Sequence, residues 1–212
     1  MINKKKILLA DDHVIIRRGL KVLLDNYFGQ SDWVETEFAK NIPELIEKNE
    51  LTHLILDMQL QDANILEVIS TIKSLSHTLP ILIYTMSSEE IFGPRMMNLG
   101  VNGYLSKQSG EEEVLKAFHT FFAGRNYFSE SLLELVSKKT YNSQNPLNSL
   151  SEREISVLNY LLKGNSVKEI TEILDLKTST VATYKGRIFD KLGVNNIIDL
   201  RNITDIYNTK IN

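Results

Sequence analysis

The fold of this chain is decided by two stretches, Ile7-Leu8-Leu9-Ala10-Asp11-Asp12 and Leu54-Ile55-Leu56-Asp57. Short apolar runs between polar turns are typical of the buried central strands of a parallel sheet. Such sheets place their functional sites beyond the carboxyl ends of the strands, so Asp11, Asp12 and Asp57 should converge at one edge. Three crowded carboxylates repel one another unless a hard cation such as Mg²⁺ lies between them. We therefore expect a cation site and phosphoryl chemistry at this edge.

Around these stretches, strand-length apolar runs alternate with helical patterns. The pattern predicts strands at 7–10, 33–38, 54–56, 80–85 and 103–105, and helices at 13–26, 42–48, 65–76, 89–99 and 111–123. A capping box of Ser109 and Glu112 is predicted to start the last of these helices. The alternation is typical of βαβ units. We therefore expect an α/β domain at residues 1–125, with a doubly wound, five-stranded parallel sheet.

A polar stretch at residues 140–149 interrupts this pattern. It lacks hydrophobic periodicity, and Pro146 disfavours helix in the residue before it. We interpret residues 126–149 as a linker that contains one helix at 129–138.

The pattern of residues 150–212 indicates helices only, so we expect a small all-α domain there. Ser151 with Glu154, and Ser166 with Glu169, form two capping boxes. The first precedes a helix that carries the apolar residues Ile155, Leu158, Leu161 and Leu162. The second precedes a short helix with Ile170, Ile173 and Leu174 toward the core. A tight turn at 176–178 and a longer helix at 179–192 complete a helix-turn-helix arrangement.

The longer helix has one apolar face, made of Val181, Tyr184, Ile188 and Leu192. Small side chains on the opposite face would let the backbone approach base edges, while Thr183 suits a thymine methyl and Arg187 suits guanine or phosphate. An ordinary solvated helix is the alternative on periodicity alone, but the two capping boxes and the tight turn favour DNA binding. The predicted DNA contacts are Lys168, Thr178, Ser179, Thr180, Ala182, Thr183, Lys185, Gly186, Arg187 and Lys191.

Composition narrows the class of protein. The net charge of −3 does not by itself indicate a nucleic-acid binder, so that prediction rests on local placement. The absence of cysteine excludes disulfides, thiolate catalysis and thiolate zinc sites. No apolar run approaches the roughly 20 residues of a membrane span, and the run after Lys4-Lys5-Lys6 is too short for a signal peptide. We expect a soluble, cytoplasmic protein.

The ordered set of motifs resembles the NarL/FixJ family of response regulators. The receiver signature is matched by the opening run to His13, by the run that ends at Asp57, by Ile83-Tyr84-Thr85, and by Gly103-Tyr104-Leu105-Ser106-Lys107. The signature of a LuxR-type helix-turn-helix domain is matched by Leu150-Ser151-Glu152-Arg153-Glu154, Lys168-Glu169-Ile170, Ser179-Thr180-Val181 and Lys191-Leu192. The resemblance covers both halves of the chain and implies a flavodoxin-like receiver followed by a DNA-binding domain.

The resemblance also implies roles for individual residues. Asp57 is expected to accept a phosphoryl group from a partner histidine kinase. Asp12 would bind Mg²⁺ directly, Asp11 mainly through metal-bound water, and Gln59 through its backbone carbonyl. Lys107 and Thr85 are expected to bind the phosphoryl group, with Tyr104 as the switch aromatic. The expected outcome of phosphorylation is a homodimer that binds double-stranded DNA, with no enzymatic activity beyond the chain's own phosphoryl transfer and hydrolysis.

Three positions depart from the family pattern. Gln61 stands where the family usually has Pro, Ile65 where it often has Gly, and Met86 where a small residue is common. Gln61 and Met86 leave open a receiver that works without phosphorylation. The presence of the whole expected set argues against that alternative: Asp11, Asp12, Asp57, Thr85 and Lys107. A second alternative is a Mg²⁺-dependent phosphatase with Asp57 as nucleophile, which would need a substrate pocket and a second acid-base group. His13 is interpreted as a helix-start residue and not as a metal ligand.

Overall fold

The computed structural model describes residues 4–60, 62–137 and 146–208. It divides the chain into two compact units, Met1–Val136 and Ser137–Asn212. The first unit is an α/β sheet structure and the second is helical, which confirms the predicted fold class. Residues 140–145 of the predicted linker, the end of its helix at 138, and Gln61 lie outside the described residues. No helix among the described residues is long and apolar enough to cross a membrane.

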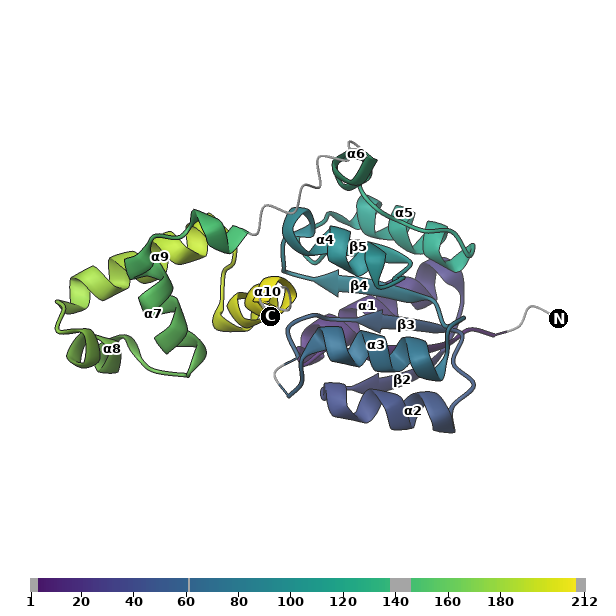
Figure 1. Cartoon of the computed structure of the whole chain (residues 1–212). Helices are drawn as coiled ribbons and strands as arrows, with labels where there is room; N and C mark the ends of the chain where they lie inside the picture. Colours follow the sequence, from purple (N-terminus) through teal and green to yellow (C-terminus); the bar gives the residue numbers. More distant parts are fainter. Residues whose placement is uncertain (1–3, 61, 138–145, 209–212) are drawn as a thin grey trace. The chain divides into compact units, whose positions relative to one another are not determined.

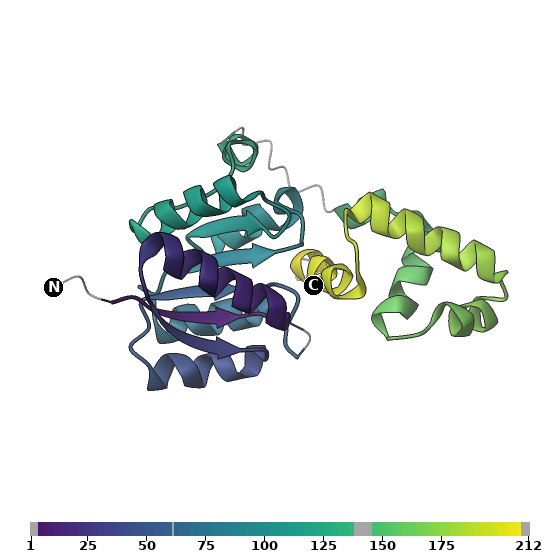
Figure 2. The ribbon, with the colours of Figure 1, turned by 180° about the vertical axis from the view of Figure 1, so that it is seen from behind.

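The sheet has five parallel strands in the order β2-β1-β3-β4-β5. Figure 1 shows α2 and α3 in front of the sheet, and Figure 2, seen from behind, shows α1 and α5 on its other face. The elements are β1 (Lys6–Ala10), α1 (Val14–Phe28), β2 (Asp32–Thr36), the 3-10 helix η1 (Ala39–Asn41), α2 (Ile42–Lys48), β3 (His53–Leu56), α3 (Ile65–Leu75), β4 (Ile81–Thr85), α4 (Glu89–Asn98), β5 (Gly103–Ser106) and α5 (Glu111–Phe122).

Alternation along the strands builds the core. Ile7, Leu9 and Ile55 pack in one cluster with buried side chains of α1 and α5, among them Leu24 and Phe118. The neighbouring residues of the same strands are also buried, because helices cover both faces of the sheet. Each such aliphatic or aromatic side chain contributes roughly 1.5–3 kcal/mol by leaving water. This rigid core fixes the strand ends that carry the site.

The predicted capping box at the start of α5 is wrong. The helix begins at Glu111, and its N-cap is Gly110, which makes no side-chain cap hydrogen bond. Ser109 therefore lies one residue before the N-cap, and its N–H donates to the carbonyl of Ser106 in the preceding turn. Three successive glutamates in the first turn favour this helix start through the positive end of the helix dipole instead.

A helix within the predicted linker packs on α4. After α5 the chain runs beside β5, where Tyr104 N–H donates to the Tyr127 carbonyl at 3.0 Å. Helix α6 (Glu130–Ser137) follows, and its Leu132 is buried. A Cβ placed on Gly93 would lie 2.8 Å from Leu132 Cδ2, so the glycine leaves the space that Leu132 occupies. Pro94 follows Gly93 inside α4, and neither residue favours helix. Packing against Leu132 thus supports a weak helix.

We predict that Gly93→Ala displaces Leu132 from α4. The added methyl group creates a clash that costs about 1–3 kcal/mol, more than the roughly 1 kcal/mol that alanine gains over glycine in a helix. Hydrogen exchange should become faster in α6, and the first unit should lose thermal stability. The matched control is Gly19→Ala in α1, where an added Cβ meets no atom within 4 Å. Unchanged exchange in α6 with the alanine at 93 would contradict the prediction.

The second unit contains the predicted helix-turn-helix. Its elements are η2 (Pro146–Ser149), α7 (Glu152–Leu162), α8 (Val167–Leu174), α9 (Thr178–Leu192) and α10 (Ile197–Asn208). Both capping boxes, of Ser151 and Ser166, are confirmed. Asp175 is the C-cap of α8 and begins the tight turn. Its φ of 51° lies in the left-handed region, a conformation that commonly ends helices.

One core prediction for this unit is wrong. Ile173 is 49% exposed, while Ile170 of the same helix is fully buried. A single apolar residue can fit a helical periodicity and still lie at the edge of a short helix's buried stripe, where the neighbouring helix does not reach it.

Candidate functional site

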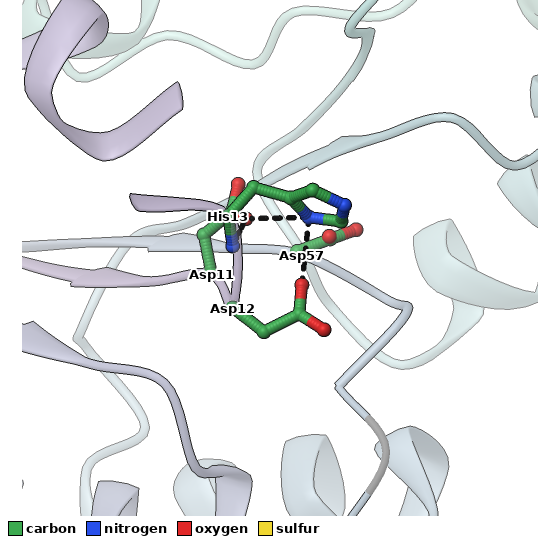
Figure 3. A group of neighbouring side chains, drawn as sticks. All are labelled: Asp11, Asp12, His13 and Asp57. Carbon is green, nitrogen blue, oxygen red and sulfur yellow. Dashed lines mark hydrogen bonds and ion pairs between the residues drawn. The ribbon is translucent and has the colours of Figure 1, made fainter. Parts of the chain in front are cut away.

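The predicted acidic site forms at the carboxyl ends of β1 and β3. These strands are neighbours in which Ala10 pairs with Leu56, so the next residues, Asp11 and Asp57, leave the sheet together. Both are 1% exposed. One ligand atom from each of Asp11, Asp12, His13 and Asp57 lies within 4.8 Å of the others, as Figure 3 illustrates. The structure therefore brings together the three carboxylates that the sequence singled out.

Lys107 links the two buried carboxylates. Its Nζ lies 2.7 Å from Asp11 Oδ2 and 2.6 Å from Asp57 Oδ2, and its side chain is only 4% exposed. Burial favours the neutral amine, but attraction to Asp57 and hydrogen bonds to Asp11 and Asp57 outweigh it and raise the pKa of Lys107. The ammonium therefore stays charged at neutral pH, and it partly neutralises the cluster.

The donor set suits a hard divalent cation. Asp12 Oδ1 is one of two buried side-chain polar atoms among the described residues that have no hydrogen-bond partner, although His13 Nδ1 lies 2.7 Å from it. Carboxylate oxygens in such a cluster are the ligands that Mg²⁺ prefers. Gln59 stands beside them, with its N–H donating to Asp57 Oδ1 at 3.2 Å. The carboxylates of Asp11, Asp12 and Asp57 thus fit a magnesium site, and the predicted Gln59 carbonyl ligand stays a prediction.

His13 is the N-cap of α1, as expected of a helix-start residue, but it makes no side-chain cap hydrogen bond. Its ring turns toward the carboxylates instead, with Nδ1 3.3 Å from Asp11 Oδ1 (Figure 3). This orientation of the ring could not be predicted from the sequence, because it depends on the turn that follows β1.

Thr85 and Tyr104 meet through Ser87. Thr85 ends β4, is fully buried, and accepts a hydrogen bond at 3.3 Å from the N–H of Ser87. The Tyr104 hydroxyl donates to the Ser87 carbonyl at 3.0 Å, so the ring is already inside the structure. Met86, which lies between Thr85 and Ser87 in the chain, is 41% exposed. The sequence reasoning did not identify Ser87, whose importance arises from its backbone groups.

Two other residues that the sequence did not single out hold the loops around the site. Asp62 accepts hydrogen bonds from the N–H groups of Ala39 and Lys40, which ties the loop after Asp57 to the loop after β2. Arg17 donates to the Asp11 carbonyl. Asp62 had a usable signal, since aspartate often caps a helical turn, but its partner lies 23 residues away.

The exposed side of α9 carries most of the predicted DNA contacts. Lys168 at the start of α8 is also exposed, whereas Thr180 and Lys185 are partly buried. The apolar face lies inward as predicted, because Val181, Ile188 and Leu192 are buried. Arg187 and the small residues Ala182 and Gly186 are accessible, and a Cβ on Gly186 would meet no atom within 4 Å. This surface can approach a DNA groove closely.

Lys191 is tied to another helix of the second unit, although its side chain is 39% exposed. Its Nζ lies 2.7 Å from Glu154 Oε2 and donates to the Ser149 carbonyl at 3.1 Å. The Glu154 side chain is 3% exposed, and it also accepts hydrogen bonds from Ser151. Lys191 therefore joins the end of α9 to the start of α7, a role that its place in the sequence did not reveal. Its predicted contact with phosphate stays a prediction.

We predict that acid weakens the second unit through Glu154. Hydrogen bonds from Lys191 and Ser151 lower the pKa of Glu154 from 4.5 to about 2. Because the folded-state pKa is depressed, the stabilisation is complete above about pH 4.5 and is lost as the pH falls toward 2. Acid unfolding followed by circular dichroism should therefore show less pH dependence in this range for Glu154→Gln, which should also be less stable at neutral pH.

The matched control is Glu152→Gln, at the exposed start of the same helix, which should leave the acid profile close to that of the parent. An identical profile for the parent and Glu154→Gln would show that the ion pair does not contribute to stability.

Comparison with known proteins agrees with both units. Residues 7–119 match the response regulator receiver domain, and residues 148–203 match the bacterial regulatory proteins of the luxR family. Response regulator UvrY of Escherichia coli is 28% identical over 200 residues, which cover 93% of this chain and 92% of that protein. Response regulator GacA of Pseudomonas aeruginosa is 28% identical over 198 residues, which cover 92% of each.

A solved structure also matches most of the chain. It is RcsB from Salmonella enterica serovar Typhimurium, bound to promoter rprA in the presence of the phosphomimetic BeF3−. The identity is 25%, the TM-score is 0.58, and the match covers 94% of this chain and 98% of that one. The receiver match alone spans more than half of this chain. The chain belongs to the NarL/FixJ family of response regulators, DNA-binding transcription regulators in which a receiver domain precedes a LuxR-type helix-turn-helix domain.

Proposed function

We propose that this chain is a transcriptional regulator activated by phosphorylation of Asp57 by a sensor histidine kinase. The observation that carries the proposal is the buried cluster of Asp11, Asp57 and Lys107, in a chain that also bears an accessible α9. The RcsB structure supports it, since that relative was captured on promoter DNA with a phosphomimetic. The proposal places the chain in the cytoplasm, where its DNA target lies.

In the proposed reaction, a carboxylate oxygen of Asp57 attacks the phosphorus of a phosphohistidine. The P–O bond forms an acyl phosphate as the P–N bond breaks, and the imidazole nitrogen leaves with the bonding pair and takes up a proton. Lys107 stabilises the added negative charge, because its ammonium already lies 2.6 Å from Asp57. Such transfers depend on positioning and charge more than on a strong base. The rigid ends of β1, β3 and β5 supply that positioning.

Mg²⁺ bound by Asp12, Asp57 and the Gln59 carbonyl, and by Asp11 through water, would neutralise the transferring oxygens. Backbone hydrogen bonds orient the carboxylates of Asp57 and Asp11 independently of a cation. Asp57 Oδ1 receives the Gln59 N–H, and Asp11 Oδ1 receives the His13 N–H at 2.8 Å. Each buried carboxylate is thus oriented by a backbone donor on its own loop.

The proposed switch runs through Ser87. The phosphoryl group brings strong acceptor oxygens beside Thr85. If the Thr85 hydroxyl turns toward them, it gives up its bond to Ser87 N–H, and the Ser87 carbonyl is also the acceptor for Tyr104. Movement of this loop therefore acts on Tyr104 and on the adjoining α4. We propose that the altered surface favours a homodimer, which binds double-stranded DNA through the two copies of α9.

Intact mass after incubation with Mg²⁺ and acetyl phosphate tests the proposal. One added phosphoryl group, together with a shift to dimer in light scattering, is the expected result. DNA binding without any phosphoryl uptake would favour the alternative of a phosphorylation-independent regulator. The feature that suggests this alternative is the large side chain of Met86, which follows Thr85 and is 41% exposed. Turnover of a generic phosphate ester tests the phosphatase alternative. The cavity of about 220 Å³ beside the site is lined by Asp12, Glu37, Phe38 and Asp62.

A further inference from the structure

We propose that Arg17 is a positioning residue that holds the peptide unit between Asp11 and Asp12 and thereby sets the affinity of the acidic site for a divalent cation. The inference rests on the proposed function for its biological purpose. Cation binding itself can be measured separately.

The Asp11 carbonyl lies just beyond the end of a strand. β1 ends at Ala10, and the N–H of Asp11 still reaches the Thr36 carbonyl at 3.1 Å. The carbonyl of Asp11 is past the last pair of the ladder, and Arg17 Nη1 donates to it at 2.5 Å. Buried backbone carbonyls require a donor. Here a side chain of α1 supplies the bond that the sheet no longer provides.

This one bond constrains two carboxylates. The peptide unit is planar, so holding the Asp11 carbonyl oxygen also restricts the positions of both flanking Cα atoms. Those Cα atoms carry the side chains of Asp11 and Asp12, two members of the cluster whose ligand atoms lie within 4.8 Å. Without the bond, the peptide could rotate and move one carboxylate away from the other.

Arg17 is itself held in place. Its side chain is 13% exposed, and Nε donates to Glu35 Oε2 on β2 at 3.0 Å. Lys21, one turn later on α1, pairs with the other oxygen of Glu35. Burial raises the pKa of Glu35, but the hydrogen bonds from Lys21 and Arg17 outweigh it and lower the pKa overall, so the carboxylate stays charged at neutral pH. The fixed fork of the guanidinium can serve Glu35 and Asp11 together.

Geometry and charge predict opposite effects for the loss of Arg17. If the residue acts by position, its removal loosens the carboxylates and weakens cation binding, because Mg²⁺ demands near-ideal octahedral geometry. If only its positive charge mattered, removal would reduce repulsion and tighten binding. The sign of the change therefore separates the two explanations.

The test is calorimetric titration of the full-length chain with MgCl₂. Arg17→Ala should weaken binding by roughly 10- to 100-fold, the usual effect of removing a group that orients metal ligands. Arg17→Lys should recover part of the loss, because it retains a donor. Lys21→Ala is the matched control: it removes a cation from Glu35 but not the bond to Asp11, and should stay within about twofold. Unfolding in EDTA checks that each variant folds.

Binding by Arg17→Ala that equals or exceeds that of the parent would overturn the inference, as would a parent that does not bind Mg²⁺. If Arg17→Ala does not fold, Arg17→Met replaces it, since methionine fills similar space but has no donor for the Asp11 carbonyl. Unchanged Mg²⁺ affinity there would overturn the inference. Phosphorylation by acetyl phosphate, measured in parallel at saturating Mg²⁺, keeps the two proposals distinct. A parent that binds Mg²⁺ but takes up no phosphoryl group contradicts only the proposed function.

Discussion

Asp57→Asn is expected to abolish phosphoryl uptake completely. The amide oxygen of asparagine is a poor nucleophile and carries no charge, so neither the P–O bond nor the attraction to Lys107 is available. The substitution keeps the shape of the side chain. Lys107 retains Asp11 at 2.7 Å, so the ammonium stays paired and the fold should persist. Phosphorylation-dependent dimerisation should be lost together with uptake.

Intact mass and light scattering on the parent and the variant measure both effects. Asp62→Asn is the matched control. Asp62 lies in the loop that follows Asp57 and accepts a hydrogen bond from Ala39 of η1, but it does not belong to the acidic cluster. It should still accept a phosphoryl group. Uptake by Asp57→Asn at the level of the parent would remove Asp57 from its proposed role and redirect attention to Asp11 and Asp12.

Arg187→Ala is expected to weaken DNA binding strongly. The side chain is exposed on α9, on the side opposite the buried Val181 and Ile188. A bidentate contact with guanine contributes about 1–3 kcal/mol, which corresponds to roughly 5- to 150-fold in affinity. Loss of such a contact also relaxes preference at one base pair, whereas loss of a phosphate contact weakens all sequences equally and reduces the salt dependence.

Duplexes selected from a random pool with the phosphorylated parent provide the probe, and competition binding at several salt concentrations gives both readouts. Arg153→Ala, an exposed arginine on α7, removes the same charge from another helix and is the matched control. Equal affinity and equal sequence preference for Arg187→Ala and the parent would exclude Arg187 from the interface.

The sequence by itself determined the sheet, its helices and the acidic edge. Apolar runs such as Leu54-Ile55-Leu56 between polar turns are typical of a buried central strand, and Asp57 directly after such a run is then expected at the strand's carboxyl end. The capping boxes at Ser151 and Ser166 were equally readable, since both partners lie within one helical turn. The box at Ser109 was wrong because a glycine took the cap position.

Only the tertiary structure decided which side chains support those elements. Arg17 holds the Asp11 carbonyl, Leu132 fills the space at Gly93, and Lys191 pairs with Glu154, which is 37 residues away. Every residue has a backbone carbonyl, so residue type does not show which carbonyl needs a side-chain donor. The packing of one helix on another depends on the positions of both in the folded chain. The sequence therefore placed the reacting groups at the ends of strands, where local pattern determines position. Their supports depend on distances between distant segments, which exist only once the core has formed.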